Sequence, residues 1–156
     1  MPAAKEPVIH RCPKGAIDIE YESVSGKGRG VWFARVPSEH TIEDVLSPAY
    51  FGLMQSENQQ GKVMRTGDVI EIEPENARWC VRARVMGLRW HTQQVLLREQ
   101  QRWDFAVKPQ PGYDFVWDGN DACWAIYKGK TKVDSGYSTE TECFEAVEEL
   151  KREKVA

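Results

Sequence analysis

Apolar and polar residues alternate along several short stretches in the first two-thirds of the chain. The clearest is 16–24, AIDIEYESV, and 78–86 repeats the pattern with arginine at the polar positions. A period of two predicts half-buried strands, because successive side chains of a strand point to opposite faces. We predict strands over 16–24, 31–36, 68–73, 78–86, 95–97 and 103–107, with a turn at 74–77.

One helix is predicted within this strand-rich region. Thr41 and Asp44 have the spacing of a capping box, which predicts a helix over about 41–46. Pro48 is tolerated in a first helical turn, so we expect helical turns to continue as far as Met54.

The pattern restarts after 108–112, KPQPG, whose prolines and glycine continue neither a helix nor a central strand. Beyond it we predict three strands and a helix, at 113–117, 122–127, 131–135 and from Thr139 onward. Thr139 with Glu142 forms a second candidate capping box. The helix has an apolar stripe that includes Cys143, Val147 and Leu150.

These elements predict an α+β protein that is mainly β, with an SH3-like or twisted β-barrel module carrying one inserted helix. Four parts are expected: an extended N-terminal arm (1–15), a β-rich module with a helix near 41–54 (16–107), a linker (108–112) and a β-β-β-α unit (113–156). The last part is small for an independent core. We therefore expect Trp124 and Leu150 to share a core that continues into the β-rich module.

Composition and charge narrow the classes of function. A net charge of −3 gives no general attraction to nucleic acid or to an anionic membrane. No apolar run approaches the roughly 18–20 residues needed to span a bilayer, and the first twelve residues contain no apolar segment typical of a secretory signal. The four cysteines, at 12, 80, 123 and 143, are not closely spaced, so free thiols and disulfides both remain open.

The sequence shows no motif of catalysis or metal binding. It contains no Gly-x-Ser-x-Gly elbow, and no CxxC, HxxxH or HExxH spacing. His10, His40 and His91 lie in separate segments, so none is an obvious base for a nucleophile. We expect a non-enzymatic protein with no catalytic residues, no cofactor and no metal.

The glycine-rich segment 26–30, GKGRG, is one candidate contact site. Glycine lets backbone N–H groups approach an anion, but the segment lacks the P-loop pattern. We interpret it as a hairpin tip or contact loop that presents Lys27 and Arg29.

The best-patterned polar feature is the predicted strand 78–86, where alternation puts Arg82 and Arg84 on one face. Residues 78–102 hold six arginines against one acid, Glu99. They could pair across strands with Glu71 and Glu73, or form a contact face for nucleic acid or an acidic protein surface. The candidate partner-binding residues are Lys27, Arg29, Arg78, Arg82, Arg84, Arg89, Trp90 and Trp103.

Three segments resemble a group of small proteins encoded by tailed bacteriophages. They are VWFARVP at 31–37, TIEDVLSPAYF at 41–51 and TGDVIEI at 66–72. That group has an aromatic strand, an E-D-(V/L)-L-x-P-A-Y helix and a G-D-x-I strand in this order. Residues 123–127 and 135–140 are similar to its closing β-β-α unit. The resemblance brings no active-site residues. It implies a virion component, such as a capsid decoration protein or a head–tail accessory protein.

Together, these observations predict a structural protein that docks on a larger protein assembly. The expected partners are other virion proteins, namely major capsid or head–tail proteins, and further copies of this chain. No membrane is expected, and the location would be the virion after synthesis in the bacterial cytoplasm. The alternative is a nucleic-acid-binding accessory protein that uses the arginine-rich 78–102 face.

Overall fold

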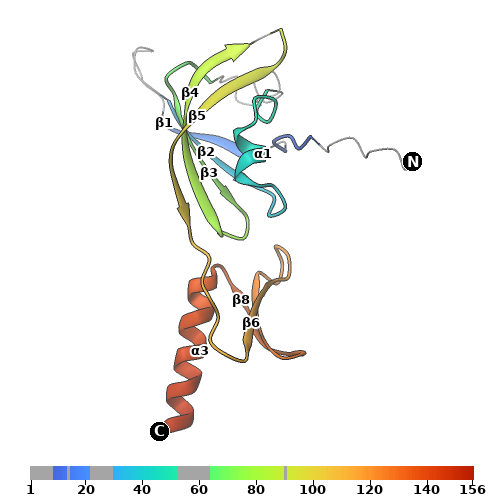
Figure 1. The fold of residues 1–156 in the computed structure, drawn as a ribbon, viewed down its shortest axis with the longest axis vertical. Coiled ribbons are helices and arrows are strands. Elements are labelled where there is room, and N and C mark those ends of the chain that lie inside the picture. Colours follow the sequence, from blue (N-terminus) through green and yellow to red (C-terminus); the bar gives the residue numbers. More distant parts are fainter. Residues whose placement is uncertain (1–8, 14, 22–29, 53–63, 90) are drawn as a thin grey trace, which may run out of the picture. The chain divides into compact units, whose positions relative to one another are not determined.

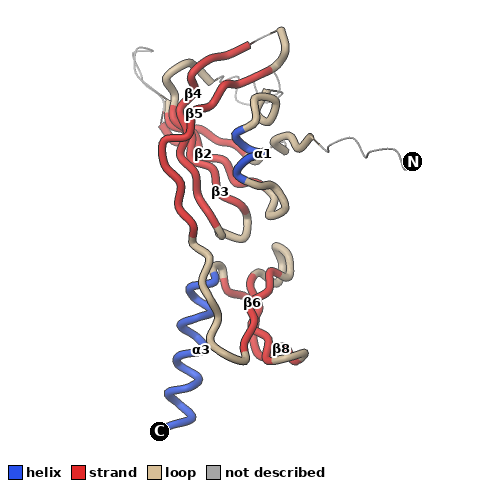
Figure 2. Tube along the Cα trace, viewed as in Figure 1, coloured by secondary structure: helices blue, strands red, loops and turns tan. Residues whose placement is uncertain are grey.

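A computed structural model of the protein describes residues 9–13, 15–21, 30–52, 64–89 and 91–156. These residues form two compact units (Figures 1 and 2). Unit 1 contains the described residues up to Ile72 together with Val81–Gln101, and unit 2 contains Glu73–Cys80 together with Arg102–Ala156. The units divide between residues 72 and 73, 80 and 81, and 101 and 102, and residues 108–112, predicted as a linker, lie within unit 2.

The protein is α+β and mainly β, as predicted. The first sheet has the strand order β1-β2-β3-β4-β5. Its strands are β1 (Ile17–Tyr21), β2 (Val31–Val36), β3 (Val69–Pro74), β4 (Trp79–Arg89) and β5 (Gln94–Asp104). Among the described residues β1 and β5 are the outer strands, so the sheet is open and the expected closure into a barrel is absent. Closure would require these two strands to pair with a matching tilt and stagger.

Several strand limits differ from the prediction, since β4 continues to Arg89, β8 continues to Tyr137, and β7 begins at Trp124 instead of 122. Two strands, β1 and β5, need comment. The first strand was expected over 16–24, but β1 ends at Tyr21, and 22–24 lie outside the described residues. The strands expected at 95–97 and 103–107 are one continuous strand, β5. The intervening residues 98–102 are all polar, and most of them are exposed. They therefore lack the alternation by which a half-buried strand is recognised.

The core of unit 1 lies on one face of this sheet. In β4, Val81, Ala83 and Val85 are fully buried, while the alternate residues remain partly or largely exposed. The other buried apolar residues come from β2, β3, β5 and the segment after β2, and they include Trp32, Val36, Val45, Tyr50, Phe51, Ile70, Ile72 and Val95.

Helix α1 (Ile42–Leu46) begins where the sequence predicted. Thr41 Oγ1 accepts a hydrogen bond from Asp44 N at 3.2 Å, and Asp44 Oδ2 accepts one from Thr41 N at 2.9 Å. These reciprocal bonds confirm the capping box, a local feature that depends on only four residues.

The helical extension toward Met54 was wrong within the described residues. Residues 48–52 form turns, in which Tyr50 N donates to Ser47 O and Gly52 N donates to Ala49 O. Gly52 lies directly against the chain before β5, since a Cβ at this position would be 1.6 Å from the carbonyl oxygen of Gln93. The segment therefore packs through a backbone-to-backbone approach that only glycine permits.

Part of the N-terminal segment belongs to unit 1. Cys12 is buried, and its backbone N–H donates to Tyr50 O at 2.9 Å. The rings of His10 and His40 lie 4.3 Å apart between centroids. The expected extended arm thus has packed residues within 9–13, whereas residues 1–8 and 14 lie outside the described part of the chain.

Unit 2 contains the predicted β-β-β-α arrangement. Its sheet has the order β6-β7-β8, and its elements are β6 (Tyr113–Trp117), β7 (Trp124–Lys128), β8 (Thr131–Tyr137) and α3 (Glu140–Val155). Trp124, Ile126, Cys143 and Val147 form the buried core, with Tyr113, Phe115, Trp117, Tyr137 and Ala146 packed around it. Leu150 is half-buried, not fully buried.

The start of α3 differs slightly from the predicted capping box. Thr139 Oγ1 accepts from Glu142 N at 3.2 Å, as expected. The Glu142 carboxylate accepts from the backbone N–H and the hydroxyl of Ser138, at 2.7 and 2.9 Å. The cap therefore extends one residue earlier than the predicted motif.

In the described part of the chain, no helix combines the length and apolar character needed to cross a membrane.

Candidate functional site

The candidate partner-binding residues fall into three groups. Lys27, Arg29 and Trp90 lie outside the described residues. Arg82, Arg84 and Arg89 belong to unit 1, whereas Arg78 and Trp103 belong to unit 2. The arginine-rich stretch 78–102 is therefore divided between two units, and each part has its own surroundings.

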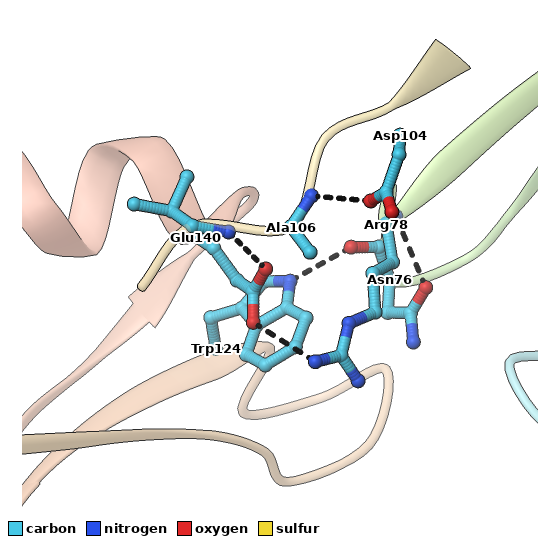
Figure 3. A network of polar contacts seen from close by, with 7 residues as sticks. Asn76, Arg78, Asp104, Ala106, Trp124 and Glu140 are labelled. Atoms are coloured by element: carbon cyan, nitrogen blue, oxygen red, sulfur yellow. Dashed lines mark hydrogen bonds and ion pairs between the residues drawn. The ribbon is translucent and has the colours of Figure 1, made fainter. Parts of the chain in front are cut away.

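In unit 2, Arg78 takes part in a local polar network (Figure 3). Its Nη2 lies 3.7 Å from Glu140 Oε1, and the Glu140 side chain is only 5% exposed. Glu140 Oε2 also accepts a hydrogen bond from Val107 N at 3.0 Å. Through these two contacts, Glu140 connects the first turn of α3 to Arg78, directly before β4, and to Val107, after β5.

The same network holds the turn between β3 and β4. Trp124 Nε1 donates to Asn76 O at 2.8 Å, and Arg78 N donates to Asn76 Oδ1 at 3.2 Å. A buried indole N–H needs an acceptor, and this turn supplies one. Arg78 is therefore engaged in structure within unit 2, and Trp103 is half-buried there.

In unit 1, the polar face of the sheet is the candidate site, and we call it the open face. The register pairs Glu71 with Arg82 and Val69 with Arg84 across β3 and β4. Arg82 Nε donates to Glu71 Oε1 at 3.1 Å, in an ion pair whose two side chains are 46% and 31% exposed. The expectation of cross-strand pairing with Glu71 is confirmed for Arg82. An exposed pair of this kind contributes about 0–1 kcal/mol.

Arg84 has different surroundings from Arg82. Its Nε is buried and has no hydrogen-bond partner among the described residues. Beside it lies a hollow of about 420 Å³, which we call the arginine hollow, lined by Arg84, Met86, Arg98, Glu99 and Gln100. Met86 is half exposed there. Arg89, at the end of β4, is exposed.

Sequence reasoning selected Arg84 but missed the rest of the hollow as a site. Met86 follows Arg84 by two residues, so alternation alone placed it on the same face. The contribution of Arg98 and Gln100 was hidden because 98–102 was not recognised as part of a strand. Their alignment beside Arg84 depends on the pairing of two strands, which one sequence does not specify.

Two buried polar side chains of unit 1, Asp68 and His40, have partners within the unit. Asp68, only 3% exposed, accepts hydrogen bonds from Gly30 N at 2.8 Å, Trp32 Nε1 at 2.9 Å and Arg65 N at 2.9 Å. His40 Nδ1 and the Tyr50 hydroxyl form a 2.8 Å hydrogen bond. Burial, followed by the nearby His10, lowers the pKa of His40 below 6.5. These contacts fix the loops around the sheet.

All four cysteines lie among the described residues, and none of them forms a disulfide. Burial raises the pKa of Cys12 to about 12 and that of Cys143 to about 11. Both groups are therefore protonated at neutral pH, and a protonated thiol is a poor nucleophile and metal ligand. Within the described residues, no three His, Cys, Asp or Glu side chains group as a metal site.

The open face thus combines one paired arginine, a second arginine with an unused buried donor, and an apolar side chain. This chemistry suits recognition of an anionic surface.

No family model matches the sequence, and the searches of curated proteins and of solved structures gave no match either.

Proposed function

We propose that this chain is a non-enzymatic interaction protein that docks on a larger protein assembly through the open face. The observation that carries the proposal is the contrast between the two faces of β4. Val81, Ala83 and Val85 are fully buried on one side, while Met86 on the other is 50% exposed. Arginine and methionine together are typical of protein interfaces. The proposal therefore assigns docking to a surface that the fold of unit 1 leaves uncovered.

The resemblance to tailed-phage proteins directs the proposal toward a virion component. The partner would be a major capsid or head–tail protein, and the chain would serve as a decoration or head–tail accessory protein. An SH3-like relationship of unit 1 is part of the same proposal. It is supported by the sequential strand order and by the short helix between β2 and β3.

Particle association tests this function. The chain, carrying an affinity tag, is expressed in the bacterium that harbours its gene, and particles are purified on a density gradient. We expect it to co-sediment with the particles in constant proportion to the capsid protein. Absence of the chain from purified particles would overturn the virion assignment.

A charge-reversal variant tests the role of the open face. Arg84→Glu with Arg98→Glu should reduce the bound amount by about tenfold or more, because charged pairs at an interface become repulsive. The matched control is Arg152→Glu with Lys154→Glu, which makes the same charge change at exposed positions of α3. Equal loss in both variants would show an effect of net charge and not of this face.

A further inference from the structure

The arginine hollow has the composition of a small anion-binding site. Two arginines, Arg84 on β4 and Arg98 on β5, line it together with Gln100. Met86 is its one apolar residue, and Glu99 is its one acidic residue. A planar guanidinium offers several N–H donors in a fixed fork, which matches the two oxygens of a carboxylate.

The loop beside Arg84 is fixed to β4 by backbone hydrogen bonds. Its Nη2 lies 3.7 Å from the position that a Cβ would take at Gly67, so the guanidinium extends beside that glycine. Gly67 N donates to Val85 O at 2.8 Å, and Val85 N donates to Asp68 O at 2.8 Å. The loop that flanks Arg84 is therefore fixed to β4, and less freedom is lost when a ligand binds.

Two acids of this region, Asp68 and Glu71, bond to groups other than Arg84. Asp68, in the same loop, already accepts three hydrogen bonds from other groups. Glu71 is paired with Arg82. The buried Nε of Arg84 has no partner among the described residues, so no internal acceptor holds this edge of the guanidinium.

We propose that the arginine hollow binds a side-chain carboxylate of an acidic polypeptide segment on the docking partner, an inference that rests on the proposed function. The carboxylate lies between Arg84 and Arg98, and a neighbouring apolar residue of the segment contacts Met86. The hollow is thereby the anchoring point of the open face.

The lining favours a polypeptide over nucleic acid. Binding to a nucleic acid draws on several phosphate contacts and on bases stacked against aromatic rings. None of the five lining residues is aromatic. The net charge of −3 also adds no general attraction. One carboxylate next to an apolar side chain fits the lining better.

A titration followed by NMR tests the inference on the full chain. The probe is a capped peptide of alternating glutamate and leucine, and the signals are the arginine Nε–H resonances. We expect saturable shifts at Arg84 and Arg98. Arg84→Gln should weaken binding by about tenfold, as expected for the loss of a charged hydrogen bond. The control Arg82→Gln should change it by less than about twofold, because Arg82 already pairs with Glu71.

Three further probes decide the identity of the ligand. The same peptide with glutamine in place of glutamate should not bind, and inorganic phosphate should bind more weakly than the glutamate peptide. A single-stranded oligothymidylate that bound more tightly at the same residues would overturn the inference in favour of nucleic acid. The absence of saturable peptide shifts at Arg84 and Arg98, in a chain whose melting temperature is normal, would also overturn it.

The test of carboxylate binding in the hollow and the test of particle association can fail independently of each other. If Arg84→Gln with Arg98→Gln abolishes peptide binding but particles retain the full amount of chain, docking stands and the hollow is not its anchor. If the unaltered chain binds the peptide but is absent from particles, the virion assignment fails while the carboxylate site stands.

Discussion

The two units use their polar side chains in different ways. In unit 2, the buried carboxylate of Glu140 and the indole of Trp124 connect α3 and β7 to the turn between β3 and β4. In unit 1, the buried acid Asp68 is also satisfied, but Arg84 on the open face keeps a buried donor without a partner. The buried Nε of Arg84 is therefore not used by the fold of unit 1, whereas the groups of the Glu140 network stabilise unit 2.

The cores differ as well. Unit 1 buries mostly aliphatic side chains from four strands, with Tyr50 and Phe51 from the turn after α1. Unit 2 surrounds a few buried residues with half-buried aromatic rings, and its Trp117 and Trp124 rings meet edge to face at 5.7 Å. A small sheet reaches sufficient burial by using large side chains.

The largest expected effect concerns the backbone approach in unit 1. Gly52→Ala should destabilise the protein by on the order of 3–5 kcal/mol, because its Cβ would lie 1.6 Å from Gln93 O and the backbone must move. The control is Gly129→Ala in the turn between β7 and β8, where φ is +64° and no atom lies within 4 Å of a Cβ. There, only the strained backbone contributes, about 1–2 kcal/mol. Urea denaturation measures both, and equal losses would contradict the tight packing at Gly52.

Local signals made parts of this fold predictable. β2 over 31–36 and β6 over 113–117 match the predicted limits, because alternation or flanking proline and glycine mark both ends. The capping box of α1 needs only Thr41 and Asp44. The open sheet and the continuity of β5 depend on pairing between distant segments, which no local pattern encodes.

The candidate site was predictable to the same extent. Alternation correctly placed Arg82 and Arg84 on one face of β4. It could not show that Arg82 is paired while Arg84 is not, since both follow the same pattern. Nor could it show that Arg78 meets Glu140, because that contact depends on how α3 packs in unit 2.

The second prediction tests the core of unit 2. Val147 is fully buried against Trp124 and Ile126, so Val147→Ala should cost about 2–3 kcal/mol through lost burial and a residual cavity. Val133→Ala on β8 removes the same atoms at a position that is 43% exposed, and should cost less than about 0.5 kcal/mol. Thermal or chemical denaturation gives both values. Similar losses at the two sites would contradict the described core.

The third prediction is a pH dependence confined to unit 1. Burial and then His10 lower the pKa of His40 below 6.5, although Glu39 and Asp44 partly oppose the shift. The unfolded chain takes up a proton near pH 6.5 while the folded chain keeps His40 neutral, so the unfolded state binds more protons. Stability should therefore fall as the pH drops below 6.5, until the lowered pKa is reached.

Urea midpoints above and below pH 6.5 measure this effect. His40→Gln should reduce the fall in stability, whereas His91→Gln, at an exposed position, should leave it unchanged. The Tyr50 hydroxyl forms a hydrogen bond with His40, and burial raises the pKa of Tyr50. Tyr50 stays protonated throughout this range. An identical fall in the His40→Gln variant would assign the pH dependence to other groups.

The smallest expected effect is the coupling of the Arg82–Glu71 ion pair, which we compare with the Arg78–Glu140 pair. A double-mutant cycle on Arg82 and Glu71 should give a coupling below about 1 kcal/mol that decreases with added salt, since both side chains are partly exposed. Glu140→Ala should cost more, about 1–3 kcal/mol, because Val107 N loses its acceptor in a buried setting. Most of that cost should also appear when Glu140→Ala is made in an Arg78→Ala background, because the Arg78 side chain is 54% exposed and its Nη2 lies 3.7 Å from Glu140 Oε1. A coupling at Arg82 and Glu71 as large as the Glu140 effect would show that this pair of the open face, like the network of unit 2, stabilises the fold.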